Sequence, residues 1–239
     1  MNRKLFLLLT GVCLTVMSAA AQVTYETGHA ILKDGTRISG LIGKYVQAPW
    51  FNQRYILFKD LADANNPKAK ITKYRADDLQ SYQVGNISYD KVHFVDLENL
   101  QLKSLGTNDH MLERLSIGRI NAHKYYQYPP DTEGFIGTEE EYIEWQKKNT
   151  NNLIEGYKIL ITKDKEAKPK NAFDVDMLKY FEDTPEIFQK FKAGTYGNEP
   201  ITEKKGLAAK MVAMAKKAAF KPQEAVAIVN AINDYNKKN

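Results

Sequence analysis

Histidines are the residues most often used for metal binding and proton transfer, and this chain has four, each isolated in the sequence: His29, His93, His110 and His123. A transition-metal site usually takes two ligands from one strand or helix, as in His-x-His or His-x-x-x-His, and neither spacing occurs here. The sequence therefore predicts no metal site. We expect the histidines to be solvated or hydrogen-bonded strand residues.

The sequence also lacks motifs for nucleophilic catalysis and phosphate binding. No Gly-x-Ser-x-Gly motif is present to supply a nucleophilic serine. Residues 40–44 have two residues between their glycines where a P-loop has four, and Tyr45 stands where a P-loop has Ser or Thr. We therefore predict no catalytic residue and no cofactor.

Acidic residues are the remaining source of catalysis, notably Asp77 with Asp78 and the run Glu139, Glu140 and Glu141. Glycoside hydrolysis uses two carboxylates about 5 to 9.5 Å apart, a separation that a sequence does not reveal. Neighbouring acidic residues alternate between strand faces or spread around a helix, which favours a solvated surface. A carboxylate-dependent hydrolase acting on envelope glycans stays open as an alternative.

The binding residues that the sequence favours are aromatic. Two prolines follow a group of three tyrosines, Tyr125, Tyr126 and Tyr128. Trp145 is a possible companion further along the chain, and Trp50 and Phe51 are further candidates. Aromatic faces stack on sugars or bases, and prolines stiffen the loop that carries them. Tyrosine is also common in strands, so packing on one strand face is the alternative. We treat Tyr125, Tyr126, Tyr128 and Trp145 as a hypothetical ligand-binding cluster.

The elements that must position these residues begin with strands. From residue 23 to about 128, apolar and polar residues alternate between short turn signals, which is typical of half-buried antiparallel strands. Asp34-Gly35 between two such runs predicts a hairpin. We expect an antiparallel β-domain over residues 22–165, with a polar excursion near 129–152 in which Thr138 begins a helix. Other expected strands cover residues 101–105, 111–126 and 153–162.

The pattern becomes helical after a lysine-rich linker that ends at residue 170. Pro185 and Pro222 are suited to the first turn of a helix. We therefore expect a C-terminal helical segment over residues 171–239. The predicted fold class is α+β, an antiparallel β-sandwich or partly open barrel followed by this segment.

Positive charge is concentrated near the C-terminus. Residues 203–239 contain eight lysines and three acidic residues, whereas residues 22–202 carry a net charge of −2. The body is thus close to neutral, and we expect no nucleic-acid partner. Residues 203–220 combine an apolar stripe with lysines, so this helix packs on the body or makes peripheral contact with an anionic membrane.

The first 21 residues have the pattern of an export signal. Arg3 and Lys4 precede an apolar run, and cleavage is expected near Ala21-Gln22, which would leave a periplasmic or extracellular protein. The run is shorter than the about 20 residues that a membrane span needs, and no other apolar segment of the chain approaches its length. We therefore expect no transmembrane span in the mature chain. The only cysteine, Cys13, would leave with the signal, and no disulfide is expected.

Several weak motifs together carry a family resemblance. They cover residues 31–40, 56–59, 74–79, 82–89, 118–120 and 178–181. In these motifs the chain resembles a group of exported proteins common in Bacteroidota. The resemblance implies export, a strand-rich N-terminal part and a helical C-terminal part, and it implies no catalytic or binding residues.

A second similarity concerns residues 31–40 alone. They are similar to the opening hairpin of Sm-like RNA-binding barrels, but residues 116–119 match the second signature strand of those barrels poorly. Any small barrel favours a tight Asp-Gly turn and a bending glycine such as Gly40, so this similarity does not indicate RNA binding.

These observations favour a non-enzymatic binding or scaffold module of the cell envelope. Its expected partner is an unknown envelope protein or glycan, with no cofactor. The alternatives are the carboxylate-dependent hydrolase and a membrane-surface-associated protein that uses the basic C-terminal helix.

Overall fold

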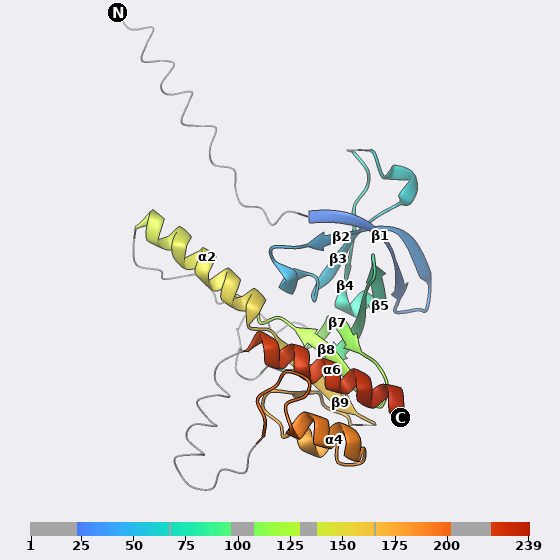
Figure 1. Ribbon diagram of the computed structural model, residues 1–239. Helices are drawn as coiled ribbons and strands as arrows, with labels where there is room; N and C mark the ends of the chain where they lie inside the picture. Colours follow the sequence, from blue (N-terminus) through green and yellow to red (C-terminus); the bar gives the residue numbers. More distant parts are fainter. Residues whose placement is uncertain (1–22, 67, 97–107, 130–137, 165, 202–220) are drawn as a thin grey trace, which may run out of the picture.

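A single antiparallel sheet of ten strands forms the framework of the protein (Figure 1). The computed structural model describes residues 23–66, 68–96, 108–129, 138–164, 166–201 and 221–239. The strand order is β10-β9-β8-β7-β6-β5-β1-β2-β3-β4. The strands are β1 (Val23–Leu32), β2 (Arg37–Tyr45), β3 (Tyr55–Lys59), β4 (Thr72–Arg75), β5 (Leu79–Val84), β6 (Ile87–His93), β7 (Asp109–Ser116), β8 (Ile120–Tyr125), β9 (Lys158–Lys163) and β10 (Lys170–Asn171).

The sheet curls on itself between β3 and β7. Ile56 of β3 and Met111 of β7 belong to one buried apolar cluster, although four strands separate β3 from β7 in the sheet order. A sheet can bring such distant strands together only by bending towards closure. The predicted α+β class is confirmed. The single curled sheet corresponds to the partly open barrel and not to a two-sheet sandwich.

Glycines allow the close approach of strands in the curled part. Gly28 of β1 pairs with Gly40 of β2. A Cβ atom on Gly28 would lie 2.2 Å from the carbonyl oxygen of Gln83, and one on Gly40 would lie 2.4 Å from that of Lys59. Since no side chain fits at such distances, both positions require glycine.

The predicted Asp-Gly hairpin is confirmed between β1 and β2. Gly35 has a φ of 87°, a backbone conformation that favours glycine. The Thr36 N–H donates to Asp34 Oδ1 over 2.9 Å, which fixes the turn.

Two of the expected strands were wrong. Residues 111–126 form the end of β7, a turn and β8, because the Gly118 N–H donates to Asn121 Oδ1 and reverses the chain there. Residues 153–162 begin as the last turn of helix α2 (Glu139–Glu155), and β9 starts only at Lys158. The helix continues through Leu153 and ends only at Gly156, whose N–H donates to the Asn152 carbonyl as the C-cap.

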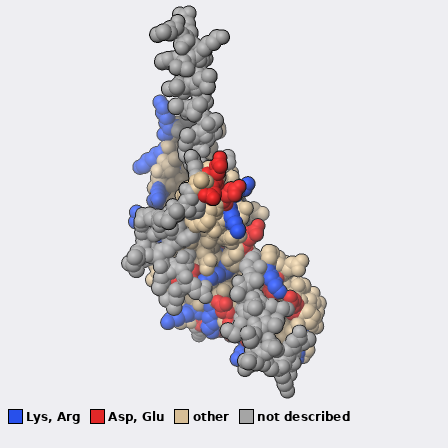
Figure 2. All heavy atoms as spheres, turned by 90° about the vertical axis from the view of Figure 1, so that its left-hand side faces the viewer, with Lys and Arg blue, Asp and Glu red and all other residues tan. Residues whose placement is uncertain are grey.

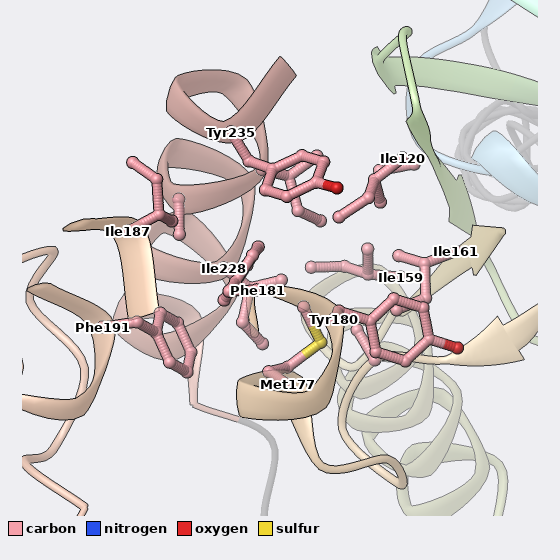
Figure 3. Close-up of a cluster of buried hydrophobic side chains, with 14 of the residues drawn as sticks. Ile120, Ile159, Ile161, Met177, Tyr180, Phe181, Ile187, Phe191, Ile228 and Tyr235 are labelled. Atoms are coloured by element: carbon pink, nitrogen blue, oxygen red, sulfur yellow. The ribbon is translucent and has the colours of Figure 1, made fainter. Parts of the chain in front are cut away.

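Helices cover one face of the sheet at β8 and β9. They are α3 (Met177–Tyr180), α4 (Pro185–Lys192) and α6 (Pro222–Lys238). The close-up in Figure 3 shows Tyr235 of α6 pointing towards Ile120 and the strand residues Ile159 and Ile161. Burial of these large apolar side chains is the main force that holds the helices on the sheet.

Hydrogen bonds from Asn236 fix α6 to the sheet. Its Nδ2 donates to Ser116 Oγ over 2.9 Å and to the Ile120 carbonyl over 2.7 Å, and its Oδ1 accepts from the Ile120 N–H over 2.9 Å. The side chain therefore satisfies both backbone groups of the first residue of β8.

The remaining described elements are three short 3₁₀ helices and the helix α2. Short 3₁₀ helices are η1 (Pro49–Phe51), η2 (Leu61–Asp63) and η3 (Ala76–Asp78). Helix α2 projects away from the end of the sheet (Figure 1) and has no buried residue among those described. The predicted helix start is confirmed, since Thr138 and Glu141 form a capping box.

Three sequence expectations fall outside the described residues: the export signal over 1–21, the strand over 101–105 and the lysine-bearing helix over 203–220. The described helices include none with the length and apolar character that crossing a membrane requires. On the face in Figure 2, positive and negative side chains are interspersed over the described surface.

We predict that Asn236→Ala lowers the free energy of unfolding by about 2 to 3 kcal/mol, because it leaves backbone groups of Ile120 without partners. Urea unfolding followed by circular dichroism measures the change. The control is Asn230→Ala, an exposed position on the same helix, which we expect to change stability by less than about 0.5 kcal/mol. Equal effects of the two substitutions would contradict the anchoring role.

Candidate binding cavity

A cavity of about 190 Å³ lies between the end of β2, the segment around η1 and the face of β6 to β8. Its lining combines aromatic, apolar and charged side chains: Lys44, Tyr45, Val46, Pro49, Asn52, Gln53, Ile87, Tyr89, Glu113, Lys124 and Tyr126. A concave site with few polar groups is the usual form of a ligand site. We therefore take this cavity as the candidate functional site.

The floor of the cavity is a row of side chains across three adjacent strands. Tyr89 of β6 pairs with Glu113 of β7, and Glu113 pairs with Lys124 of β8. Paired residues of neighbouring strands point to the same face, so the three side chains lie next to one another. Tyr126 follows two residues after Lys124 and therefore lies on the same face.

Asn52 shapes the loop that forms the roof. Its Oδ1 accepts from the Tyr45 N–H over 2.9 Å, and its Nδ2 donates to the Tyr45 carbonyl over 3.0 Å. The backbone carbonyl of Asn52 accepts from the Tyr82 hydroxyl over 3.0 Å. These contacts hold the segment between β2 and β3 in one conformation.

Gln53 attaches the roof to the floor. Its Nε2 donates to the Tyr126 carbonyl over 2.8 Å, and its Oε1 accepts from the Tyr126 N–H over 2.6 Å. The side-chain amide thus pairs with Tyr126 as a neighbouring strand would. The backbone carbonyl of Gln53 also accepts from the Met111 N–H over 2.9 Å. Because Gln53 is 2% exposed, these bonds form away from competing water.

Aromatic rings pack around Tyr45, one of the residues that line the cavity. Tyr45 contacts Phe51 with ring centroids 5.3 Å apart and Tyr55 at 5.7 Å. The Tyr55 hydroxyl donates to the Tyr45 hydroxyl over 3.2 Å. Val46 stands at the entrance with 58% of its surface exposed. The lining therefore joins a tyrosine held by other aromatic rings to an exposed valine.

Glu113 and Lys124 form an ion pair in the floor, with Lys124 Nζ 3.2 Å from Glu113 Oε1. Both side chains are about one-fifth exposed, so water screens the pair only partly. The Lys124 ammonium also lies 4.9 Å from the centre of the Tyr157 ring, which stabilises its charge. The floor therefore presents a compensated pair of opposite charges.

Burial raises the pKa values of the Tyr89 and Tyr126 phenols above the usual value of 10, and the nearby Glu113 carboxylate raises them further. Both phenols therefore stay protonated at neutral pH. A neutral phenol both donates and accepts hydrogen bonds, so these two lining residues carry polar groups without charge.

The predicted aromatic cluster is divided between different parts of the fold. Tyr126 lines the cavity, whereas Tyr125 and Tyr128 lie together on the opposite sheet face, with ring centroids 6.3 Å apart. Trp145 stacks on Tyr142 along α2, at 6.2 Å. Consecutive strand residues face opposite sides, which explains why Tyr125 and Tyr126 do not share a surface.

Most residues of the cavity were not singled out by sequence reasoning. Asn52, Gln53 and Glu113 belong to no motif, and Tyr89 only ends the weak family motif over residues 82–89. These residues meet only through the curl of the sheet. Strand alternation places Lys124 and Tyr126 on one face, and this pattern was the one indication in the sequence that the two residues share a site.

The acidic residues singled out in the sequence lie at helix starts. Asp78 Oδ2 accepts from the Arg75 N–H at the start of η3, and Glu141 Oε2 accepts from the Thr138 N–H at the start of α2. Carboxylates stabilise the positive end of a helix there. Across the described ranges, no group of three His, Cys, Asp or Glu side chains is arranged to hold a metal ion.

His110 is buried on the opposite face of the sheet, beside Tyr125 and Tyr128. Its Nδ1 lies 3.0 Å from the Tyr128 hydroxyl and its Nε2 lies 3.1 Å from the Phe94 carbonyl. Burial lowers the pKa of His110 to about 4, from an ordinary value of 6.5. The imidazole is therefore neutral at physiological pH and acts as a structural residue.

We predict that Gln53→Ala lowers the free energy of unfolding by about 2 to 4 kcal/mol, because the backbone groups of Tyr126 lose two buried partners. Chemical denaturation measures the change. Gln189→Ala, at an exposed position, is the matched control and should change stability by less than about 0.5 kcal/mol. If Gln53→Ala leaves the free energy of unfolding almost unchanged, the roof is not held by this amide.

We also predict that stability falls as the pH drops from about 6.5 to about 4. As the pH falls, His110 is protonated in the unfolded state before it is protonated in the folded state. The free energy of unfolding therefore decreases by roughly 3 kcal/mol over this range, at about 1.36 kcal/mol per unit of pKa shift. Urea midpoints at several pH values measure the loss. His110→Gln should flatten this dependence and the exposed His93→Gln should retain it. An unchanged slope in His110→Gln would refute the assignment.

Comparisons of the chain with protein-family models, with curated proteins and with solved structures gave no significant match. The function of the cavity therefore has to be inferred from its own geometry.

Proposed function

We propose that this protein is a non-enzymatic binding module of the cell envelope and that the cavity is its ligand site. The observation that carries the proposal is the fixed roof above a polar floor. Asn52 and Gln53 hold the roof through four side-chain hydrogen bonds to the backbone of Tyr45 and Tyr126. A site whose walls are already ordered loses little conformational entropy when a ligand binds.

The floor supports the proposal because it has hydrogen-bonding capacity to spare. Within the described residues, the contact with Lys124 engages one carboxylate oxygen of Glu113, and no protein hydrogen bond engages the hydroxyl of Tyr126. Such groups in a concave site are available to a ligand.

The small number of carboxylates in the cavity lining favours ligand binding over hydrolysis as the function. Glu113 is the only carboxylate among the described lining residues, and it is paired with Lys124. Hydrolysis of glycosides usually requires two carboxylates on either side of the scissile bond. A single, charge-compensated glutamate fits recognition better than acid-base catalysis.

The envelope location in this proposal rests on the sequence. Residues 1–21 have the order of charge, apolar run and small residues typical of an export signal. The resemblance to exported proteins of Bacteroidota supports the same location, either periplasmic or extracellular. The scaffold role, the glycan hydrolase and membrane contact through residues 203–220 stay sequence-based hypotheses.

We predict that small polar compounds bind in the cavity and that Val46→Trp weakens this binding at least tenfold, because a large side chain at the entrance blocks access. Chemical-shift changes in a labelled protein map the site while a library of sugars, amino acids, short peptides and nucleosides is titrated. The control is Val226→Trp on α6, where the valine has nearly the same exposure, 57%.

Two results would overturn the proposed function. One is that no compound of the library shifts the signals of cavity residues, or that Val46→Trp binds as tightly as Val226→Trp. The other is that a bound compound is consumed during prolonged incubation with the wild-type protein, which would indicate an enzyme.

A further inference from the structure

We infer that the cavity takes one uncharged sugar residue, which it holds between tyrosine rings and the Glu113–Lys124 ion pair. This inference rests on the proposed function, because it names the ligand of the same site. Three properties of the cavity lead to it: its size, its mixture of aromatic and polar walls, and its compensated charge. Of its two lysines, Lys124 is paired with Glu113 and Lys44 with Glu26.

The size of the cavity limits the ligand to one ring-sized group. Its volume of about 190 Å³ is below the ~300 to 1,000 Å³ of pockets that enclose drug-sized molecules. The roof cannot move away from the floor easily, because the Gln53 side chain is bonded to the backbone of Tyr126. A longer glycan could therefore insert a single residue while the rest of the chain stays outside.

The charge of the floor favours an uncharged ligand. A carboxylate or an amine would have to compete for Lys124 or Glu113 and would leave the other partner without compensation in a poorly hydrated place. A sugar hydroxyl donates to Glu113 or accepts from Lys124 without separating the pair. Such hydrogen bonds to charged groups are stronger than those between neutral groups.

The aromatic walls favour a ligand with one apolar side. Tyr45 from the roof and Tyr126 from the floor both line the cavity. A pyranose ring has a face of C–H groups that packs on an aromatic ring and an edge of hydroxyls that needs polar partners. The tyrosine rings and the ion pair provide these two environments within one site.

The test compares ligand classes on the full chain. Methyl glycosides of neutral hexoses are titrated beside the corresponding uronic acids, free amino acids and nucleosides, and chemical shifts locate each binding event. We expect the neutral glycosides to shift the signals of Tyr126 and Lys124 and to bind at least tenfold more tightly than the charged classes.

Substitutions of the ion pair test the proposed contacts. Glu113→Gln should lower the affinity for the neutral glycoside at least tenfold, whereas Glu182→Gln, at an exposed position, should leave it unchanged. If Glu113→Gln proves unstable by its melting curve, Val46→Trp at the exposed entrance reports on the same cavity without altering the floor.

The outcomes separate this inference from the proposed function. Binding of amino acids, uronic acids or nucleosides in the cavity, with no binding of neutral glycosides, overturns the sugar assignment and leaves a binding module. Binding of glycosides that Glu113→Gln does not weaken also overturns the assignment. Absence of any binding in the cavity overturns both.

Discussion

The pairing of the Gln53 side chain with the backbone of Tyr126 is the constraint on which the cavity depends. It joins positions 73 residues apart and connects the β2–β3 segment to the residue that follows β8. A glutamine amide presents one N–H and its C=O side by side, as a single strand residue does, so it can replace a missing strand neighbour. The cavity is the space left beneath this connection.

The two faces of the sheet around β8 have different tasks. One face carries Lys124 and Tyr126 in the cavity and Ile120 under the helices, while the other carries Tyr125 beside the neutral, buried His110. Strand alternation divides the roles, since each residue has only one face available. The same strand therefore supports the candidate site, the apolar cluster under the helices and the buried group around Tyr125 and His110.

Local signals in the sequence were sufficient for the fold class and for several element boundaries. The Asp34-Gly35 turn, the Thr138 capping box and the first-turn prolines act over a few residues, so their chemistry is visible in the chain. The cavity depends on contacts between distant residues, such as that of Gln53 with Tyr126. No local pattern distinguishes such a glutamine from one on the surface. The sequence therefore predicted a site from aromatic residues close together in the chain, and the cavity, which joins distant residues, was missed.

The attachment of α6 through Asn236 has a consequence for how the molecule matures. The strands β8 and β9 precede α6 in the chain, so their isoleucine-rich face is only partly covered, by the α3 and α4 region, until α6 has been made. The curled part around Ile56 and Met111 has its own core and needs none of that segment. A chain in which α6 has not yet packed therefore exposes apolar strand surface, which is the kind of surface that makes incompletely folded chains prone to aggregate.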